Sequence, residues 1–241
     1  MIKVDTIIPF CSYDEKFIND TINGVRNISS KIIVTYFDFT FDGLPENQNL
    51  INSLKESNRD CIFVKLDYNK NNSSRWHHNY TRWIGSQIAT SEYILYLDAD
   101  EVFESNKITS WFKNQKSLKD VTTFANYWYF RSKRYRANTI EDSPVMINKS
   151  LVVKDRIFHD LERAAFKYYG FDLELGVMGD DNTPMCHHYS WVLSKDEMLR
   201  KTKSWGHRSD KNWEKLIEEE FSREFNGTDF IHNYIYTILE D

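Results

Sequence analysis

Two hydrophobic periods alternate along the first hundred residues. Short runs rich in β-branched and aromatic residues have the length and composition of buried strands, and they occupy residues 4–10, 31–37, 61–66 and 93–97. Between these runs apolar residues recur every three or four positions, which is typical of helices with one buried face. This repeated order of strand and helix predicts a parallel, doubly wound α/β sheet.

The intervening helices have recognisable starts. Ser12 and Glu15 have the spacing of a capping box, so a first helix is expected from there to about Ile28. We expect Pro45 in the first turn of a second helix, where its missing amide hydrogen costs nothing. A third helix is expected over residues 74–89, because its apolar positions recur at helical spacing.

After residue 101 the pattern becomes mixed. It predicts a short helix, a strand and a hairpin turning near Asn148, over residues 108–112, 122–130 and 144–153. The final third is expected to be helical. It has a second capping box at Ser194 and Glu197, an amphipathic stretch over 213–221 and an apolar stretch over 230–239.

Composition is compatible with one compact domain. The 241 residues are 41% hydrophobic and 15% aromatic, which is ample for a buried core and for surfaces that stack on bases or sugar rings. With only 8 Gly and 4 Pro, the chain contains no flexible linker and no internal repeat.

The charge argues against one class of partner. A formal net charge of -5 lacks the basic footprint of a nucleic-acid-binding protein. Basic residues gather at two places, namely Lys133, Arg134 and Arg136, and then Arg200, Lys201 and Lys203. Such clusters are usually solvated faces, and a phosphate site is the alternative.

The cysteines and the start of the chain bear on location. Cys11, Cys61 and Cys186 are odd in number and widely spaced, which is unlike a disulfide or metal pattern and favours a reducing compartment. No signal-peptide core is present, and no apolar run approaches the ~20 residues that a membrane helix needs. We therefore expect a soluble cytoplasmic protein without a transmembrane segment.

The apolar run at residues 93–97 ends in three carboxylates, Asp98, Asp100 and Glu101. In open α/β sheets ligands bind at the carboxyl ends of the strands. Hard oxygen ligands suit Mg²⁺ or Mn²⁺ carrying a phosphate, whereas the lack of cysteine ligands disfavours zinc. The alternative is a solvated acidic turn, because Asp is common in turns.

Four other segments have to be considered together with this motif. Ile7-Ile8-Pro9 precedes a polar turn and a helix, and Arg82 lies three residues before Gly85 in the helix before the acidic strand. Later in the chain come Arg156-Ile157-Phe158-His159-Asp160 and His188-Tyr189-Ser190-Trp191.

Together with Asp98-Ala99-Asp100, these segments resemble the motifs of family 2 glycosyltransferases, which have the GT-A fold. The similarity is to small bacterial members that build surface glycans. Two departures stand out. Thr81 and Trp83 replace the Ala and Asn that flank the family's arginine, and Asp160 stands where its H-E segment has Glu.

The resemblance implies transfer of a sugar from a nucleoside-diphosphate sugar, with a UDP-type donor favoured, to the hydroxyl of a glycan or other acceptor. Residues 1–241 would form a single GT-A domain. Within it, residues 1–101 would bind the donor and residues 102–241, with the C-terminal helices, would face the acceptor. Trp191 or Trp205 could floor an acceptor sugar, and core packing is the alternative for each.

The resemblance also implies a metal site for Mn²⁺ or Mg²⁺. Asp100 would bind the ion directly. Asp98 would bind it too, or hold the ribose or a metal-bound water. His188 would be the third ligand, and His187 is the alternative because adjacent residues need not point the same way.

On the donor side, Pro9 and Ser12 would lie against the nucleotide, although Ser12 could simply cap its helix. Arg82 would contact the diphosphate or base, with a surface arginine as the alternative. Asp38 occupies the position where family members recognise a uracil-type base, and a turn-forming role is equally compatible with it.

Inverting transfer needs a general base for the acceptor hydroxyl. Asp160 is the candidate because it holds the acidic position of the H-E-like segment, with Glu162, Asp180 and Asp181 as rivals. A helix-capping role for Asp160 is the alternative.

Two other functions use similar residues. A sugar-1-phosphate nucleotidyltransferase would be expected to carry a Gly-rich phosphate loop after its first strand, and residues 9–13 contain no Gly. A degenerate transferase kept as a glycan-binding or scaffold protein would not need Asp98, Asp100 and His188 intact.

Overall fold

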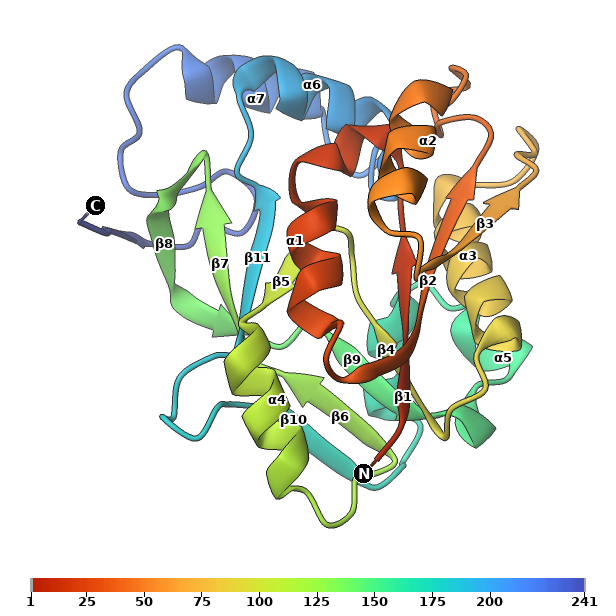
Figure 1. The fold of residues 1–241 in the computed structure, drawn as a ribbon. Coiled ribbons are helices and arrows are strands. Elements are labelled where there is room, and N and C mark those ends of the chain that lie inside the picture. Colours follow the sequence, from red (N-terminus) through yellow and green to blue (C-terminus); the bar gives the residue numbers. More distant parts are fainter. Residues whose placement is uncertain (1, 241) are drawn as a thin grey trace.

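The computed structural model describes residues 2–240, whose strands form two sheets (Figure 1). The seven-stranded sheet has the order β10 (Leu173–Val177), β6 (Val121–Phe124), β9 (Val145–Asn148), β4 (Tyr93–Tyr96), β1 (Val4–Pro9), β2 (Ser29–Phe37) and β3 (Ile62–Leu66). The five-stranded sheet has the order β12 (Tyr236–Ile238), β8 (Ser132–Glu141), β7 (Asn126–Phe130), β11 (Cys186–Trp191) and β5 (Glu101–Phe103).

The helices connect and cover these strands. The α-helices are α1 (Glu15–Val25), α2 (Gln48–Ser57), α3 (Ser74–Ile88), α4 (Ser105–Asn114), α5 (Lys154–Ile157), α6 (Lys195–Lys203) and α7 (Trp213–Phe221). Short 3-10 helices are η1 (Ser12–Asp14), η2 (Lys149–Leu151) and η3 (Glu162–Tyr168). In Figure 1 helices α6 and α7 run along the top of the view.

The seven-stranded sheet is mostly parallel. Strand β1 pairs in parallel with β2 and β4, β2 with β3, and β10 with β6, whereas β9 runs antiparallel to both of its neighbours. The mostly parallel, helix-flanked sheet expected from the sequence is confirmed. The predicted strands at residues 4–10, 31–37, 61–66 and 93–97 are all present, to within two residues at each end.

The two faces of this sheet pack against different helices. Ile8 belongs to a core cluster with residues of α1 and α2, and Ile7 belongs to a second cluster with residues of α3. This separation follows from the alternation of side chains along a strand. Helix α3 lies so close to β1 that a Cβ on Gly85 would come within 2.5 Å of Ile7 Cγ2, so the glycine permits the packing.

Several predicted helices are confirmed. Helix α3 begins at Ser74 behind an N-cap at Ser73, whose side chain accepts a hydrogen bond from the Trp76 amide. Helix α7 covers the predicted residues 213–221. The predicted short helix at 108–112 is present as the longer α4.

The second capping box is formed and the first is not. Ser194 and Glu197 cap α6 reciprocally. Near the amino terminus, Ser12 opens a 3-10 turn instead, and its amide donates to the Glu46 carboxylate at 3.2 Å. Helix α1 therefore begins at Glu15 and ends at Val25, short of the expected Ile28.

Pro45 does not open a helix as expected. It forms an isolated antiparallel bridge with Phe39, and helix α2 begins three residues later at Gln48. The cap is Asn47, whose side chain accepts from the Leu50 amide. A side-chain cap at Asn47 thus decides where this helix begins.

Two predicted β segments are organised differently. Residues 122–130 form two strands rather than one, because the chain passes at Ala125 from β6 in the larger sheet to β7 in the smaller. The expected hairpin over 144–153 is wrong: β9 is a buried strand paired with β4 and β6, and the chain then enters η2. The apolar run Val145, Met146 and Ile147 is fully buried, because its side chains belong to the two core clusters on the faces of the sheet.

The predicted terminal helix over 230–239 is also wrong. These residues form a turn and then β12, which pairs with β8. The Asp229 carboxylate accepts hydrogen bonds from the amides of residues 231–234 and from the Tyr236 hydroxyl. These bonds fold the chain into a turn in which Asn233 has a φ of 61°, so a right-handed helix cannot continue through this segment.

No helix within residues 2–240 is both long and apolar enough to cross a membrane.

Candidate active site

The three carboxylates follow β4 in a tight turn. The Glu101 amide donates to the Asp98 carbonyl at 3.1 Å, and the Asp98 amide donates to Glu101 Oε2 at 2.8 Å. The turn lies at the carboxyl end of the parallel strands, where α/β proteins bind ligands. Because Asp98 and Asp100 lie on either side of Ala99, the turn gives their side chains different partners.

Asp98 is held by two buried arginines. Arg82 of α3 donates from Nη2 to Asp98 Oδ1 at 2.8 Å. Arg163 of η3 donates to both oxygens of Asp98, at 3.2 and 3.1 Å. Burial by itself would raise the pKa of Asp98, but the two guanidinium groups outweigh it and hold the pKa below its usual range.

The same arginines bind two further acids. Arg163 donates to Glu101 Oε1 at 2.6 Å, and Arg82 donates to Glu162 Oε2 at 2.6 Å. Complete burial raises the pKa of Glu101 in spite of Arg163. For Glu162 burial is outweighed by His78, whose Nδ1 is 3.0 Å from Oε2, and by Arg82, so the pKa of Glu162 is lowered.

Asp100 has a different cation. Lys201 of α6 donates from Nζ to Asp100 Oδ2 at 2.7 Å and lies 3.0 Å from Asp14 Oδ1. Asp100 Oδ1 is buried and has no hydrogen-bond partner among the described residues, and His188 Nε2 is 3.4 Å away from it. Burial would raise the pKa of Asp100, but Lys201 and His188 lower it.

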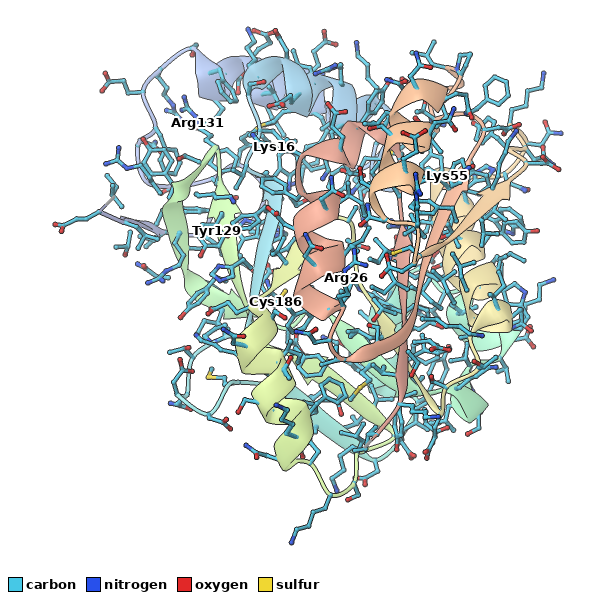
Figure 2. The ribbon with its side chains drawn as sticks, viewed as in Figure 1. Lys16, Arg26, Lys55, Tyr129, Arg131 and Cys186 are labelled. Carbon is cyan, nitrogen blue, oxygen red and sulfur yellow. The ribbon has the colours of Figure 1, made fainter. Side chains whose placement is uncertain are left out.

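His187 and His188 point to opposite sides of β11, as neighbours on a strand must. His188 faces the carboxylates, with its ring against Trp128. His187 faces away: its Nδ1 lies 2.7 Å from the Tyr129 hydroxyl and its Nε2 lies 3.2 Å from Glu104. Figure 2 labels Tyr129 on β7 beside β11. Burial lowers the pKa of His187.

A divalent cation fits this donor set. Single atoms of Asp98, Glu101 and His188 lie within 4.8 Å of one another. Asp100 Oδ1 has no hydrogen-bond partner within residues 2–240 and lies 3.4 Å from His188 Nε2, so the two atoms offer one oxygen and one nitrogen ligand at a separation compatible with a shared ion. The oxygens of Asp98, by contrast, already accept from arginine.

A pocket opens at the carboxyl ends of β1 and β2. Among the residues lining it are Pro9, Cys11, Asp14, Phe37, Phe39, Phe41, Glu46, His78 and Trp205. Pro9 lines this pocket, and its contact with a nucleotide stays a prediction. Asp38 is at the end of β2, but its Oδ1 accepts from the Tyr68 amide at 2.9 Å, and its neighbours Phe37 and Phe39 line the pocket instead.

A wider cleft adjoins this pocket, because both are lined by His78 and Trp205. The cleft is lined also by Arg82, Asp98, Trp128, Glu141, Asp160, Glu162, Arg163 and His188. Its wall thus brings together residues from the five-stranded sheet, from the turn after β4, and from α3 and η3.

The candidate bases have distinct surroundings. The side chain of Asp160 is 88% exposed at the cleft wall, with Arg75 Nη1 3.7 Å away. Glu162 lines the same cleft but is bound to Arg82. Asp180 accepts from Ser110 of α4 and Asp181 pairs with Lys107 of the same helix, so both belong to another surface.

The two tryptophans expected near an acceptor differ. Trp191 is 1% exposed and packs among Trp205, Trp213 and Phe230, so it is a core residue. Trp205 is half-buried and lines both the pocket and the cleft.

Sequence reasoning found Arg82 but missed three other residues of the site, Arg163, Lys201 and His78. Arg163 had no motif to mark it. Lys201 lay in a basic cluster of the kind that is usually solvated, yet it is buried. Its place in α6 offered a signal, because a lysine on the inner face of an amphipathic helix must meet a carboxylate. His78 sits four residues before Arg82 and thus on the same face of α3.

No protein-family model and no curated protein matches the sequence. Among solved structures, the inositol-1-phosphate CTP transferase from T. maritima aligns with 8% identity over 86% of this chain and 97% of its own, with a TM-score of 0.51. S. aureus TarS aligns with 12% identity over 93% of this chain and 46% of its own, with a TM-score of 0.50. The bifunctional IspDF from Campylobacter jejuni aligns with 12% identity over 82% of this chain and 54% of its own, with a TM-score of 0.48.

This chain therefore spans about half the length of TarS and of IspDF, and nearly the whole CTP transferase. At such identities the likeness concerns the fold. The chain shares the mixed α/β fold of the CTP transferase and of TarS. The acidic turn of this chain lies at the carboxyl end of its parallel strands.

Proposed function

We propose that this protein is a metal-dependent glycosyltransferase resembling family 2. It would move a sugar from a nucleoside-diphosphate sugar, with UDP-type donors favoured, to the hydroxyl of a glycan or other acceptor, with inversion. The observation that carries the proposal is that Asp100 Oδ1, which has no hydrogen-bond partner among the described residues, lies 3.4 Å from His188 Nε2 just after the end of β4.

Asp100 and His188 would hold Mn²⁺ or Mg²⁺, which when bound neutralises charge on the leaving nucleoside diphosphate. Asp98 has a different part. Together with Glu101 and Glu162, it keeps Arg82 and Arg163 in place at the cleft wall, where Arg82 would contact the diphosphate of the donor.

The donor base would enter the pocket at Pro9, where Phe37, Phe39 and Phe41 supply rings for stacking. Asp38 bonds the Tyr68 amide through one carboxylate oxygen, and a contact with the base would use the other. The sugar would then lie toward the adjoining cleft.

Asp160 would take the proton from the acceptor hydroxyl as that oxygen attacks the anomeric carbon. Its carboxylate lies at the cleft wall and is exposed, whereas the rival Glu162 is bound to Arg82 and His78. A base must be free to accept a proton, and the lowered pKa of Glu162 makes that residue a weaker base.

A thermal-shift screen of nucleoside diphosphates with Mn²⁺ or with EDTA tests the proposal. A ligand at 100 times its dissociation constant adds about 2.7 kcal/mol to the unfolding free energy. We expect UDP to raise the melting temperature only with the metal. Equal shifts of the melting temperature in EDTA and in Mn²⁺ would contradict the metal role. If no nucleotide shifts the melting temperature, the scaffold alternative would be favoured.

A sugar-1-phosphate nucleotidyltransferase is the alternative enzyme. The turn after β1, Phe10-Cys11-Ser12-Tyr13-Asp14, has no glycine to cradle a triphosphate. The products discriminate: nucleotidyl transfer releases pyrophosphate from a nucleoside triphosphate, and glycosyl transfer releases a nucleoside diphosphate.

A further inference from the structure

Lys201 places a permanent positive charge inside the proposed metal site. Its side chain is 10% exposed, and its Nζ lies 2.7 Å from Asp100 Oδ2 and 3.0 Å from Asp14 Oδ1. Helix α6 carries Lys201 from the C-terminal part of the chain. Lys203, two residues later in the same helix, is exposed. Few lysines are buried this deeply unless they are paired.

The two oxygens of Asp100 have unequal surroundings. Oδ2 accepts from Lys201, whereas Oδ1 has no hydrogen-bond partner among the described residues and faces His188. A divalent cation bound at Oδ1 and His188 would therefore share one carboxylate with an ammonium group. Like charges so close repel strongly in a buried site, so Lys201 opposes the ion unless another anion arrives.

A nucleoside diphosphate is such an anion. Asp14, the second partner of Lys201, lines the pocket at the end of β1. Lys201 itself lines neither the pocket nor the cleft, but Asp14 connects it to the pocket, so a diphosphate running from that pocket toward the cleft would compensate its charge.

We propose that Lys201 is the resident counter-cation of Asp100. In this role Lys201 keeps the metal affinity of the free protein low, so that the metal binds together with the nucleoside diphosphate. This positioning role rests on the proposed function. By linkage, whatever the diphosphate adds to metal affinity the metal adds to diphosphate affinity.

The first test omits nucleotide. Binding of Mn²⁺ alone is measured from the electron paramagnetic resonance signal of free Mn²⁺, for the wild type, Lys201→Met and Lys203→Met. We expect Lys201→Met to bind Mn²⁺ at least about 10-fold more tightly, and Lys203→Met to stay within about 2-fold, because an exposed charge is screened. A merely structural role would loosen the site and weaken binding, so equal, weaker or undetectable binding by Lys201→Met overturns the proposal.

The second test adds UDP. In the wild type UDP should raise the Mn²⁺ affinity by at least about 10-fold, and in Lys201→Met this coupling should largely disappear. Coupling of the same size in both proteins contradicts the proposal. If UDP does not bind even with Mn²⁺, the proposed donor is wrong, and the measurement with Mn²⁺ alone still decides the role of Lys201.

Asp14→Asn covers the case in which Lys201→Met does not fold. The Asp14 side chain is 23% exposed, so the change is mild, and it leaves Lys201 with Asp100 as its carboxylate partner. We then expect weaker Mn²⁺ binding than in the wild type. Unchanged or tighter binding by Asp14→Asn overturns the proposal.

Discussion

The parallel-strand half of the chain supplies the acidic turn of the site together with Arg82, and the half that follows Glu101 supplies most of the cations around that turn. The first half supplies Asp98 and Asp100 at the end of β4, and the second supplies Arg163, His188 and Lys201 from three different elements. Acids two residues apart are a local feature of one turn, whereas their counter-charges arrive only when the chain has folded back. The acidic motif is therefore local in the sequence, but residues that follow Glu101 determine its chemistry.

The largest expected effect concerns the exposed carboxylate of the later half. Asp160→Asn should lower transfer to the acceptor by about 10²–10⁴-fold, because a positioned base acts only as the proton leaves. Nucleotide binding should be nearly unchanged. The measurement is the rate of nucleoside diphosphate release at saturating donor.

Glu162→Gln is the matched comparison for Asp160. Glu162→Gln should lower the unfolding free energy, because it weakens the bond with Arg82, and it should lower the transfer rate as well. If Asp160→Asn keeps more than about a tenth of wild-type activity, Asp160 is not the base.

Next in size is the ion network that joins the halves. Asp98→Asn should lower the unfolding free energy by about 3 kcal/mol, because it leaves Arg82 and Arg163 buried with a lost partner. Denaturant unfolding measures this. The exposed pair of Lys215 and Glu219 is the control: breaking it should cost less than about 1 kcal/mol. Equal costs would mean that the network contributes no more than a surface pair.

The two histidines of β11 should separate by face. His188→Ala should weaken Mn²⁺-dependent UDP binding by at least about 10-fold, the cost of losing even an outer partner of a metal site. His187→Ala should change it little, because His187 faces Tyr129 and Glu104. Titration calorimetry on both variants decides. The reverse ranking would make His187 the ligand.

The smallest effects test whether the halves unfold together. Gly85→Ala should cost about 1–3 kcal/mol by forcing α3 away from Ile7, and Ser194→Ala about 1 kcal/mol by removing the cap of α6. Because ion pairs link the halves, both variants should shift one common melting transition. Two separate transitions would contradict the expectation of one domain over residues 1–241.

Local patterns were sufficient for much of the first half. Its strands and α3 have clear periods, and Asp98 and Asp100 follow directly from the end of an apolar run. The capping box at Ser194 was also readable, because its bonds stay within four residues.

Long-range contacts account for what could not be predicted. Ser12 bonds Glu46 instead of capping its helix, and β9 finds its partners in β4 and β6 instead of in a hairpin. Asp229 closes a turn before β12, and β12 pairs with the distant β8 where a terminal helix was expected. Arg163 meets Asp98 across 65 positions of the chain, a pairing that no local spacing can indicate.

The most direct test of the metal role is calorimetric titration of UDP into wild type and Asp100→Asn, each with Mn²⁺ and with EDTA. The account predicts binding to the wild type with Mn²⁺ and its loss in EDTA, which removes the ion, or in Asp100→Asn, which removes the carboxylate charge beside His188 that would hold the ion. UDP binding of equal strength in EDTA, or equal binding by wild type and Asp100→Asn, would contradict it.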